Sequence, residues 1–498
     1  MGYPALTFRG KTPDENIEMN MFLFVLALAF TGMLHSAERP NILWIISEDM
    51  SAKFGCYGNT EISTPNVDRL AAEGIRFSRA YVTAPICSTS RSALITGMHQ
   101  SSIGCQHHRS GRGNVKITLP NGVVPIPALF KEAGYWTCNA DWPTNSAKGI
   151  AKTDYNFEWD TSIYDGNDWT GRKPGQPFFA QIQLRGGKER DGAKAEDVLR
   201  RQLGSLTPAE QLALPTYYPR TTAMLADWGL TLDACRLVDV QVGQIRERLA
   251  KEGVLDNTVI MFITDHGVSH ARGKQFLYDE GTHIPCIMRG PGIAAKTVRD
   301  DLVEHIDLAA TSLALAGISR PAAMQARDVL AADYRAREAI FGARDRADET
   351  VDHIRSVRTD RWLYIRNYLP KRPYLQPNRY KDHKPCVIEL RNAETKGLLS
   401  EMQKSLLFSP TRPEEELYDY RTDTDQVVNL ASDPAHAAVL QEMRDRLKAW
   451  EEQSGDQGRK PESAAQYDSD MDVILKTQKD PELKANIELM KRWAAEGR

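Results

Sequence analysis

Two uninterrupted apolar runs of strand length restrict the folds that this chain can adopt. They cover residues 41–47 (NILWIIS) and residues 259–264 (VIMFIT). Such a run is typical of a strand buried on both faces, as in a parallel sheet covered by helices. Helical patterns lie between them, one opening at Thr64-Pro65 and one with apolar residues at steps of three and four over residues 232–249. The sequence therefore predicts an α/β fold in which helices sandwich a large, mostly parallel sheet.

Ligand-type side chains follow both buried strands directly. Glu48-Asp49 come after the first strand, and Asp265-His266 come after the second. Ligands of such sheets bind beyond the carboxyl ends of the strands, so we expect the two pairs to meet. Carboxylates brought together need a cation, and hard oxygen ligands favour calcium or magnesium over zinc. Each pair taken alone is also explained as a turn at a strand end.

The sequence changes in character near residue 340, where short alternating runs replace the long ones. These runs predict a smaller antiparallel sheet, and helical patterns follow near residues 435–452 and 482–495. We therefore divide the chain into an N-terminal extension with a signal peptide (1–37), a catalytic domain (38–340) and a smaller C-terminal α+β domain (341–498).

The N-terminal apolar run at residues 21–34 is too short to span a bilayer comfortably, because about 20 residues are needed. It is typical of a secretory signal cleaved near Ala37, which predicts a periplasmic or secreted protein. Acidic residues precede it where positive charge is usual, and a start at Met19 or Met21 would explain them. An N-terminal membrane anchor is the alternative interpretation.

The overall charge of the chain indicates no general attraction to nucleic acid or to an anionic membrane. The 63 lysine and arginine residues balance 66 aspartate and glutamate residues, so no global field favours nucleic acid or an anionic membrane. We expect no nucleic-acid partner and no membrane contact beyond export. The seven cysteines show no CxxC pair and no metal-ligand spacing, and their pairing is not given by the sequence.

Residues 87–97 (CSTSRSALITG) carry the most specific chemical signal in the chain. Cys87 follows an apolar lead-in, Arg91 lies four residues on, and a helix is predicted to start between them. The segment resembles the signature of the type I sulfatases, in which Cys-x-Pro-Ser-Arg precedes Ala-x-Leu-x-Thr-Gly. Read alone, Cys87 is equally well explained as a small buried residue at a strand-to-helix turn.

The resemblance covers most of residues 40–435 and implies an alkaline-phosphatase-like fold and a sulfatase activity. In that family the cysteine is oxidised to formylglycine, whose hydrate attacks sulfur with one hydroxyl and expels sulfate with the other. Cys87 would then need a formylglycine-generating maturase as a partner. Position 89 is threonine where the family has proline or, less often, alanine, and the maturase reads that position.

The resemblance also implies the roles of the residues around Cys87. A calcium ion, with magnesium as the alternative, is expected to bind Glu48, Asp49, Asp265, His266 and the modified residue 87. Arg91 matches the arginine that holds the formylglycine turn, and Lys274 matches a family lysine that acts on the sulfate. We assign Lys152, Lys274 and His270 to substrate binding, since the Gly-Lys-Trp-His segment of many sulfatases is absent here.

The general acid is not given by a motif, because the family's Pro-His pair is also missing. The candidates are His107, His108, His270 and His283. We favour His108, since residues 107–109 follow the nucleophile helix closely. A correctly placed acid contributes about 10²–10⁴ in rate.

Basic and aromatic residues interleave between residues 355 and 384, which suits a polyanionic sugar, although a solvated strand face is the alternative. The order of segments, with Tyr217-Tyr218-Pro219 before the long helix, looks nearest to the N-sulfoglucosamine sulfohydrolase branch. We therefore expect an exported sulfatase acting on a sulfated carbohydrate. The alternatives are a phosphonate or phosphodiester hydrolase of the same superfamily, or a non-catalytic sulfated-glycan-binding protein if Cys87 is not matured.

Overall fold

The computed structural model describes residues 1–5, 39–144, 148–192 and 194–498. Residues 40–498 form one compact unit, and the following description refers to it. The predicted signal segment at residues 21–34 and its cleavage point near Ala37 lie outside the described residues. Within the described part of the chain, no helix has the length and apolar character needed to cross a membrane.

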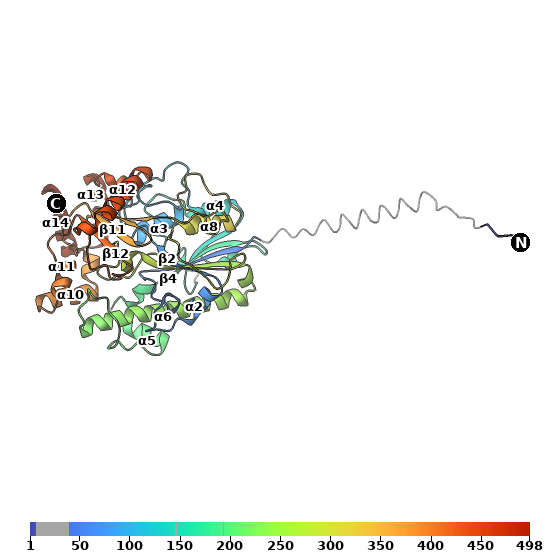
Figure 1. The fold of residues 1–498 in the computed structure, drawn as a ribbon, viewed down its shortest axis with the longest axis horizontal. Coiled ribbons are helices and arrows are strands. Elements are labelled where there is room, and N and C mark those ends of the chain that lie inside the picture. The colour runs from blue at the N-terminus through green and yellow to red at the C-terminus, as the bar shows by residue number, and fades with distance from the viewer. Residues whose placement is uncertain (6–38, 145–147, 193) are drawn as a thin grey trace. The chain divides into compact units, whose positions relative to one another are not determined.

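An eight-stranded sheet forms the centre of this unit (Figure 1). Its strand order is β3-β4-β1-β5-β6-β2-β7, and β8 pairs with β2 beside β7. Strands β3, β4, β1 and β5 are parallel, whereas β6 runs antiparallel to both β5 and β2. The strands are β1 (Asn41–Ser47), β2 (Ile75–Tyr81), β3 (Trp136–Asp141), β4 (Phe178–Leu184), β5 (Thr258–Thr264), β6 (His283–Arg289), β7 (Thr297–Arg299) and β8 (Val303–Glu304). The predicted large, mostly parallel sheet is confirmed.

Helices cover both faces of this sheet (Figure 1). Alternate residues of β1 divide between two cores, with Ile42, Trp44 and Ile46 on one side and Leu43 and Ile45 on the other. The first core includes residues of α3, α4 and α8, and the second includes residues of α2 and α6. These helices and their neighbours are α2 (Pro65–Ala72), α3 (Cys87–Thr96), α4 (Ile126–Glu132), α5 (Ala195–Leu203), α6 (Thr222–Lys251), α7 (Asp279–Thr282) and α8 (Asp307–Leu315). Burial on both faces explains why the strands read as unbroken apolar runs.

A separate four-stranded antiparallel sheet follows, with the order β12-β11-β10-β9. Its strands are β9 (Ile340–Arg344), β10 (Ile354–Arg358), β11 (Trp362–Asn367) and β12 (Glu415–Asp419). Val357, Tyr364 and Leu417 pack against α12 on one face of it. The helices of this part are α9 (Arg379–Asp382), α10 (Pro385–Thr395), α11 (Glu401–Leu407), α12 (Ala437–Gln453), α13 (Ala464–Thr477) and α14 (Pro481–Ala495). The smaller antiparallel sheet is confirmed, and the domain boundary at residue 340 stays a prediction.

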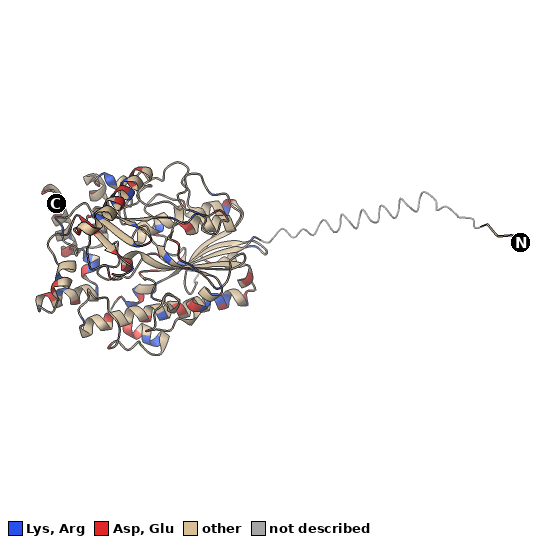
Figure 2. Cartoon of the chain, viewed as in Figure 1, with Lys and Arg blue, Asp and Glu red and all other residues tan. Residues whose placement is uncertain are grey.

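Short 3-10 helices connect several of these elements. They are η1 (Gly55–Tyr57), η3 (Thr161–Ile163), η4 (Trp169–Gly171), η5 (Gly186–Arg190), η6 (Leu255–Asn257), η7 (Pro434–His436) and η8 (Gln457–Arg459). Positive and negative side chains are interspersed along the surface helices, as the balanced composition leads one to expect (Figure 2).

The register of the central strands brings three chain segments to one edge. Ser47 at the end of β1 is level with Thr264 at the end of β5 and with Leu184 at the end of β4. The residues that follow these three strands therefore leave the sheet side by side.

Candidate active site

Cys87 is the first residue of α3 and is almost completely buried. Ile86 before it is extended (φ −148°, ψ 140°), so the chain turns directly from an extended segment into the helix. Cys87 itself is 3% exposed. The first turn of a helix leaves backbone N–H groups without helical acceptors, and its dipole favours an anion. A sulfate held at Cys87 would therefore meet backbone donors.

The structure brings four of the predicted residues, Asp49, Cys87, Asp265 and His266, into one buried cluster. The ligand-type atoms that they offer all lie within 4.8 Å of one another. His266 Nε2 is 3.1 Å from the Cys87 sulfur and 3.2 Å from Asp49 Oδ1. The Asp49 backbone N–H donates to Asp265 Oδ1 over 3.1 Å. Two carboxylates and an imidazole beside residue 87 form a donor set that fits a divalent cation.

Glu48, the remaining predicted ligand, directs its carboxylate at cationic side chains. Lys152 Nζ donates to Glu48 Oε2 over 2.9 Å, and Lys188 Nζ contacts the same oxygen. Arg91 NH2 lies 3.6 Å from Glu48 Oε1. The glutamate side chain is one methylene longer than that of aspartate, and its carboxylate therefore reaches these three cationic groups. In this arrangement Glu48 neutralises cations beside the four-residue cluster.

Lys274 places its ammonium group against the Cys87 side chain. Its Nζ is 3.0 Å from the Cys87 sulfur and 3.1 Å from Asp49 Oδ1. The hydroxyl of Tyr380 donates to Asp49 Oδ2 over 3.0 Å and lies 3.3 Å from Lys274 Nζ. Burial acts to lower the pKa of Lys274, but the surrounding negative groups, with the Asp49 carboxylate first among them, together outweigh burial and raise the pKa well above its usual value. Lys274 therefore stays positively charged at neutral pH.

Arg91 connects the nucleophile helix to the ends of two strands. Its Nε donates to Asp265 Oδ2 over 3.2 Å, and its NH1 donates to Gln183 Oε1 on β4 over 2.7 Å. The side chain is buried, and its NH2, 3.6 Å from Glu48 Oε1, has no hydrogen-bond partner among the described residues. These contacts are those of a residue that positions α3 and Asp265.

His108 contacts the residue next to Cys87. Its Nδ1 is 2.7 Å from the hydroxyl of Ser88, and that hydroxyl also accepts a hydrogen bond from the Arg109 backbone N–H over 2.8 Å. Its Nε2 lies 3.6 Å from Asp348 Oδ1, a residue beyond β9. Burial lowers the pKa of His108 well below its usual value. Burial therefore favours the neutral imidazole, and the ring lies between Ser88 and Asp348.

The other three candidate histidines make contacts away from the four-residue cluster. His270 is completely buried, and its Nε2 lies 2.8 Å from Asp227 Oδ2. His283 Nε2 is 2.9 Å from the backbone oxygen of Ser78. His107 lines a cavity on the outside of its loop. The structure therefore does not bring the predicted substrate-binding residue His270 to the nucleophile.

Two site residues, Lys188 and Tyr380, were not predicted. Lys188 lies in η5, directly after β4, and burial lowers its pKa to about 8. Tyr380 lies in α9, and Lys274 Nζ is 4.6 Å from its ring centroid. The position of Lys188 just beyond a buried strand was a signal that could have identified it. For Tyr380 the signal was its place in the basic and aromatic stretch.

Most of the basic residues in that stretch do not form an open surface for a polyanion. Arg355 is completely buried and binds Asp345 and Asp456, and Arg358 is 3% exposed and pairs with Asp279. Such ion pairs hold the second sheet to its surroundings. These two arginines therefore belong neither to a glycan-binding surface nor to a solvated strand face.

Strained backbone conformations gather around the cluster. Asp49, Arg109, Asp154 and Asp348 all have positive φ, at 55°, 55°, 58° and 50°. Positive φ is uncommon for residues other than glycine, and it occurs preferentially at functional sites. The four residues come from four different loops, and each contacts another charged or ligand-type group of this region. Their strain is consistent with a functional role for these loops.

Known proteins resemble this chain over nearly all of residues 40–498. A family model described as Sulfatase matches residues 40–318, and one described as N-sulphoglucosamine sulphohydrolase, C-terminal, matches residues 267–407. An ulvan-active sulfatase of Formosa agariphila is 32% identical over 470 residues, covering 86% of this chain and 77% of that protein. The N-sulphoglucosamine sulphohydrolase of Homo sapiens is 24% identical over 485 residues, covering 86% and 93%. A solved 2-O GAG sulfatase has the same fold, with a TM-score of 0.61 at 20% identity over 85% of this chain and 94% of that one.

Proposed function

The chain belongs to the sulfatase family, and we propose that it is an exported sulfatase that removes sulfate from a sulfated glycan. The nucleophile in this proposal is a formylglycine made from Cys87, and the metal is calcium rather than magnesium. One observation carries the proposal: Asp49, Asp265, His266 and Lys274 all converge on the Cys87 side chain. A cysteine that only fills a hydrophobic core would not need charged side chains around its sulfur.

The glycan substrate is inferred from relatives. The relative at 32% identity is described as active on ulvan, and another is described as an N-sulphoglucosamine sulphohydrolase. We extend to this chain only what the two descriptions share, a sulfated carbohydrate. Export is inferred from the apolar run at residues 21–34 and from the extracellular nature of such a substrate.

The residues around Cys87 support each requirement of sulfate transfer. The hydrated formylglycine would supply one hydroxyl to attack sulfur and a second to release the sulfate. Lys274 and the first turn of α3 offer positive charge and N–H donors to the sulfate oxygens as negative charge moves to the leaving oxygen. Lys152 and Lys188 add two ammonium groups on the Glu48 side. Arg91 keeps Asp265 and the helix in place.

His108 is our proposed general acid for the leaving oxygen. The Ser88 hydroxyl fixes the orientation of its ring, and Asp348 lies on the side of its other nitrogen. Burial favours the neutral imidazole, and an anion bound beside the ring would favour the protonated form that can donate. His270 is not retained in this role, because its Nε2 contacts Asp227.

A divalent cation is expected to bind Asp49, Asp265 and His266 beside residue 87. It would supply positive charge that polarises the sulfate and favours the ionised nucleophile. The two carboxylates favour calcium or magnesium, and His266 is the softest member of the set. Glu48 would join this shell only if its contacts with Lys152 and Lys188 opened.

The test is the mass of the tryptic peptide covering residues 80–91, from protein made in its native host. Formylglycine at Cys87 replaces the elements of hydrogen sulfide with one oxygen. The modified protein should hydrolyse an aryl sulfate faster than it hydrolyses an aryl monoester of phenylphosphonate. Thr89→Pro is the matched variant, because it restores the family residue and should raise the modified fraction if threonine limits maturation. An unmodified Cys87 in protein that still binds sulfated oligosaccharide would instead favour a non-catalytic binding protein, and faster phosphonate turnover would favour the phosphonate hydrolase.

A further inference from the structure

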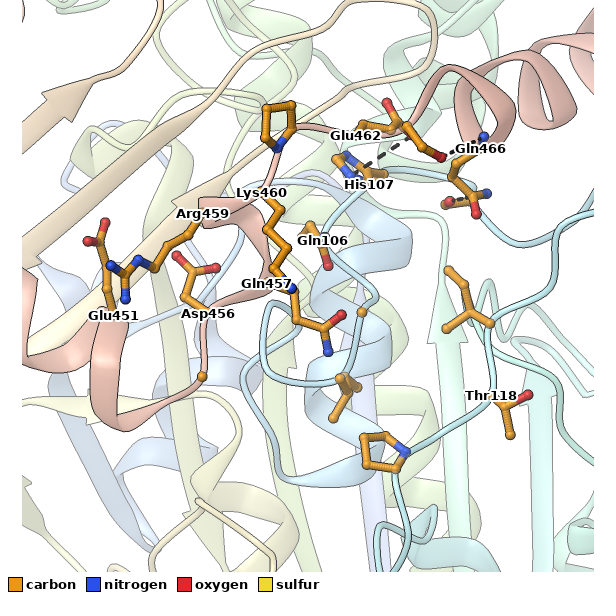
Figure 3. Close-up of a pocket in the computed structure, with 18 of the residues that line it drawn as sticks. Gln106, His107, Thr118, Glu451, Asp456, Gln457, Arg459, Lys460, Glu462 and Gln466 are labelled. Atoms are coloured by element: carbon orange, nitrogen blue, oxygen red, sulfur yellow. Dashed lines mark hydrogen bonds and ion pairs between the residues drawn. The ribbon is translucent and has the colours of Figure 1, made fainter.

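A cavity of about 850 Å³ separates the loop of residues 103–120 from the segment of residues 451–466 (Figure 3). The loop follows the nucleophile helix α3, and the segment runs from the end of α12 into α13. The Gln457 backbone N–H donates to the Ser101 backbone oxygen over 3.0 Å, which joins the two walls. The cavity therefore exists only because the C-terminal helices pack on the nucleophile loop.

Two of the carboxylates that line this cavity form ion pairs with buried arginines. Arg355 Nε donates to Asp456 Oδ2 over 2.6 Å, and Arg346 Nε donates to Glu462 Oε2 over 2.8 Å. Both arginines are completely buried. These two acidic side chains are therefore not available to repel an anion as free charges would.

Two lysines in the cavity wall have no such partner. Lys116 and Lys460 are exposed, and neither lies within ion-pair distance of a carboxylate among the described residues. Lys460 extends into the middle of the cavity beside Gln106 and Gln457, whereas Arg459 lies beside Glu451 at one end (Figure 3). Lys460 thus offers an ammonium group in the middle of the cavity. Lys116, whose Nζ donates to the Arg112 backbone oxygen over 3.4 Å, adds a second ammonium group in the wall, which also contains Glu451 and Glu452.

Gln106 lines the same cavity and holds a polar atom without a hydrogen-bond partner among the described residues. The side chain is only 9% exposed, and its Oε1 is buried with no hydrogen-bond partner among the described groups. Buried polar groups are nearly always hydrogen-bonded, so an orphaned acceptor in the cavity wall indicates a missing donor. A sugar hydroxyl is such a donor. Ammonium groups beside an unpaired amide suit a ligand with both acidic groups and hydroxyls.

The cavity adjoins the nucleophile through its loop. Gln106 and His107 line the cavity, and His108 contacts Ser88, the residue after Cys87. Two residues of extended chain span at most about 7 Å, so one loop has the cavity on one side and the candidate active site on the other. A glycan with one sulfate at Cys87 would have further sugars near this loop.

We propose that the cavity is a second binding site for the same sulfated polysaccharide chain. In it Lys116 and Lys460 bind sulfate or carboxylate groups of sugars away from the one being hydrolysed, and Gln106 accepts a hydrogen bond from a sugar hydroxyl. This inference rests on the proposed function and adds to it a preference for long chains over short ones.

The experiment compares sulfate release from aryl sulfate, a sulfated disaccharide and a sulfated octasaccharide. The variants are Lys116→Ala/Lys460→Ala and Gln106→Leu, and the matched control is Lys396→Ala/Lys484→Ala, which removes two exposed lysines elsewhere. We expect the cavity variants to lose about five- to tenfold in kcat/KM on the octasaccharide, since each exposed ionic contact contributes modestly. Their rates on aryl sulfate should equal those of the wild type. The loss in the lysine variant should shrink at high salt, because salt screens exposed charges.

Calorimetric binding of the octasaccharide to the inactive Cys87→Ala protein gives a second readout. The cavity variants made in that background should bind more weakly than Cys87→Ala alone, and the control should not. The proposal is overturned if the cavity variants keep the octasaccharide preference and affinity, or if the control loses as much. A wild type that hydrolyses aryl sulfate but neither oligosaccharide would overturn the glycan function and this inference together, which is a distinct result.

Discussion

Lys274 brings a positive charge to within 3.0 Å of the Cys87 sulfur, and that charge is matched by Asp49 on its other side. Both groups are buried, so their interaction is screened far less than that of a surface pair. If a sulfate occupies this place, Lys274 is the group whose charge acts most directly on its oxygens.

Substitution of Lys274 by methionine is expected to reduce kcat on aryl sulfate by about 10²–10³, the usual effect of removing one electrostatic stabiliser. Methionine keeps most of the length and removes the charge. The measurement is steady-state kinetics on protein with the same modified fraction at Cys87. Lys131→Met, which removes a lysine paired with Asp165 at a partly exposed position, is the control and should leave kcat unchanged. A wild-type kcat in Lys274→Met would remove this lysine from the mechanism.

At the scale of secondary structure, local sequence patterns predicted several strands and helices correctly. The run at residues 41–47 is β1, the run at 259–264 begins one residue inside β5, and the helix expected over 232–249 lies within α6. The two strands are buried on both faces and are therefore apolar at consecutive residues, whereas α6 is buried along one side and is apolar at steps of three and four. The strand order could not be predicted in this way. The pairing of β2 with β6 and β7 joins residues far apart in the chain, and no local sequence pattern indicates it.

The same distinction explains which site residues could be predicted. Asp49 and Asp265 follow apolar strands, and Cys87 stands in a recognisable motif. Tyr380 lies more than 300 residues from Asp49 in the chain, and only packing of α9 against the sheet edge brings its hydroxyl to that carboxylate. A contact between residues so far apart in the chain cannot be predicted from a motif or from residue spacing.

Helix α14 docks on the segment after β9 through a buried carboxyl group. Glu349 Oε1 accepts hydrogen bonds from the Arg379 backbone N–H over 2.6 Å and from Asn486 Nδ2 over 3.0 Å. Burial raises the pKa of Glu349 to about 7, from an ordinary value of 4.5. The folded protein therefore binds this proton more tightly than the unfolded chain does.

The sign of the resulting pH dependence follows from linkage. Between about pH 4.5 and about pH 7 the folded state holds more protons, so the free energy of unfolding contributed by Glu349 falls as pH rises through that window and is constant above it. The loss is at most about 3 kcal/mol. Glu349→Gln keeps the carbonyl acceptor and should flatten this part of the profile in urea unfolding at several pH values. The exposed Glu401→Gln is the control, and a slope that survives in Glu349→Gln would assign it to another group.

At the scale of the whole molecule, one arginine joins the C-terminal helices to the nucleophile loop. Arg346 contacts Glu462 before α13 and Asp470 within it, and its NH1 donates to the His108 backbone oxygen over 3.2 Å. The position of His108 beside Ser88 thus depends on residues more than 350 positions later. Packing of the two parts of the chain supports both the candidate active site and the proposed second glycan site.

Metal binding is expected to stabilise the whole molecule, because the cluster joins the ends of β1 and β5 to the start of α3. An ion that binds only the folded state adds about 2.7 kcal/mol at a concentration one hundred times its Kd. Protein treated with a chelator should therefore show a lower Tm, and added calcium should restore it in a concentration-dependent way, with magnesium less effective. Asp265→Asn removes one carboxylate of the cluster and should make Tm insensitive to calcium. If chelated wild-type protein unfolds at the same temperature with and without calcium, Asp49, Asp265 and His266 do not form a cation site and their charges are balanced by Lys274 and Arg91 alone.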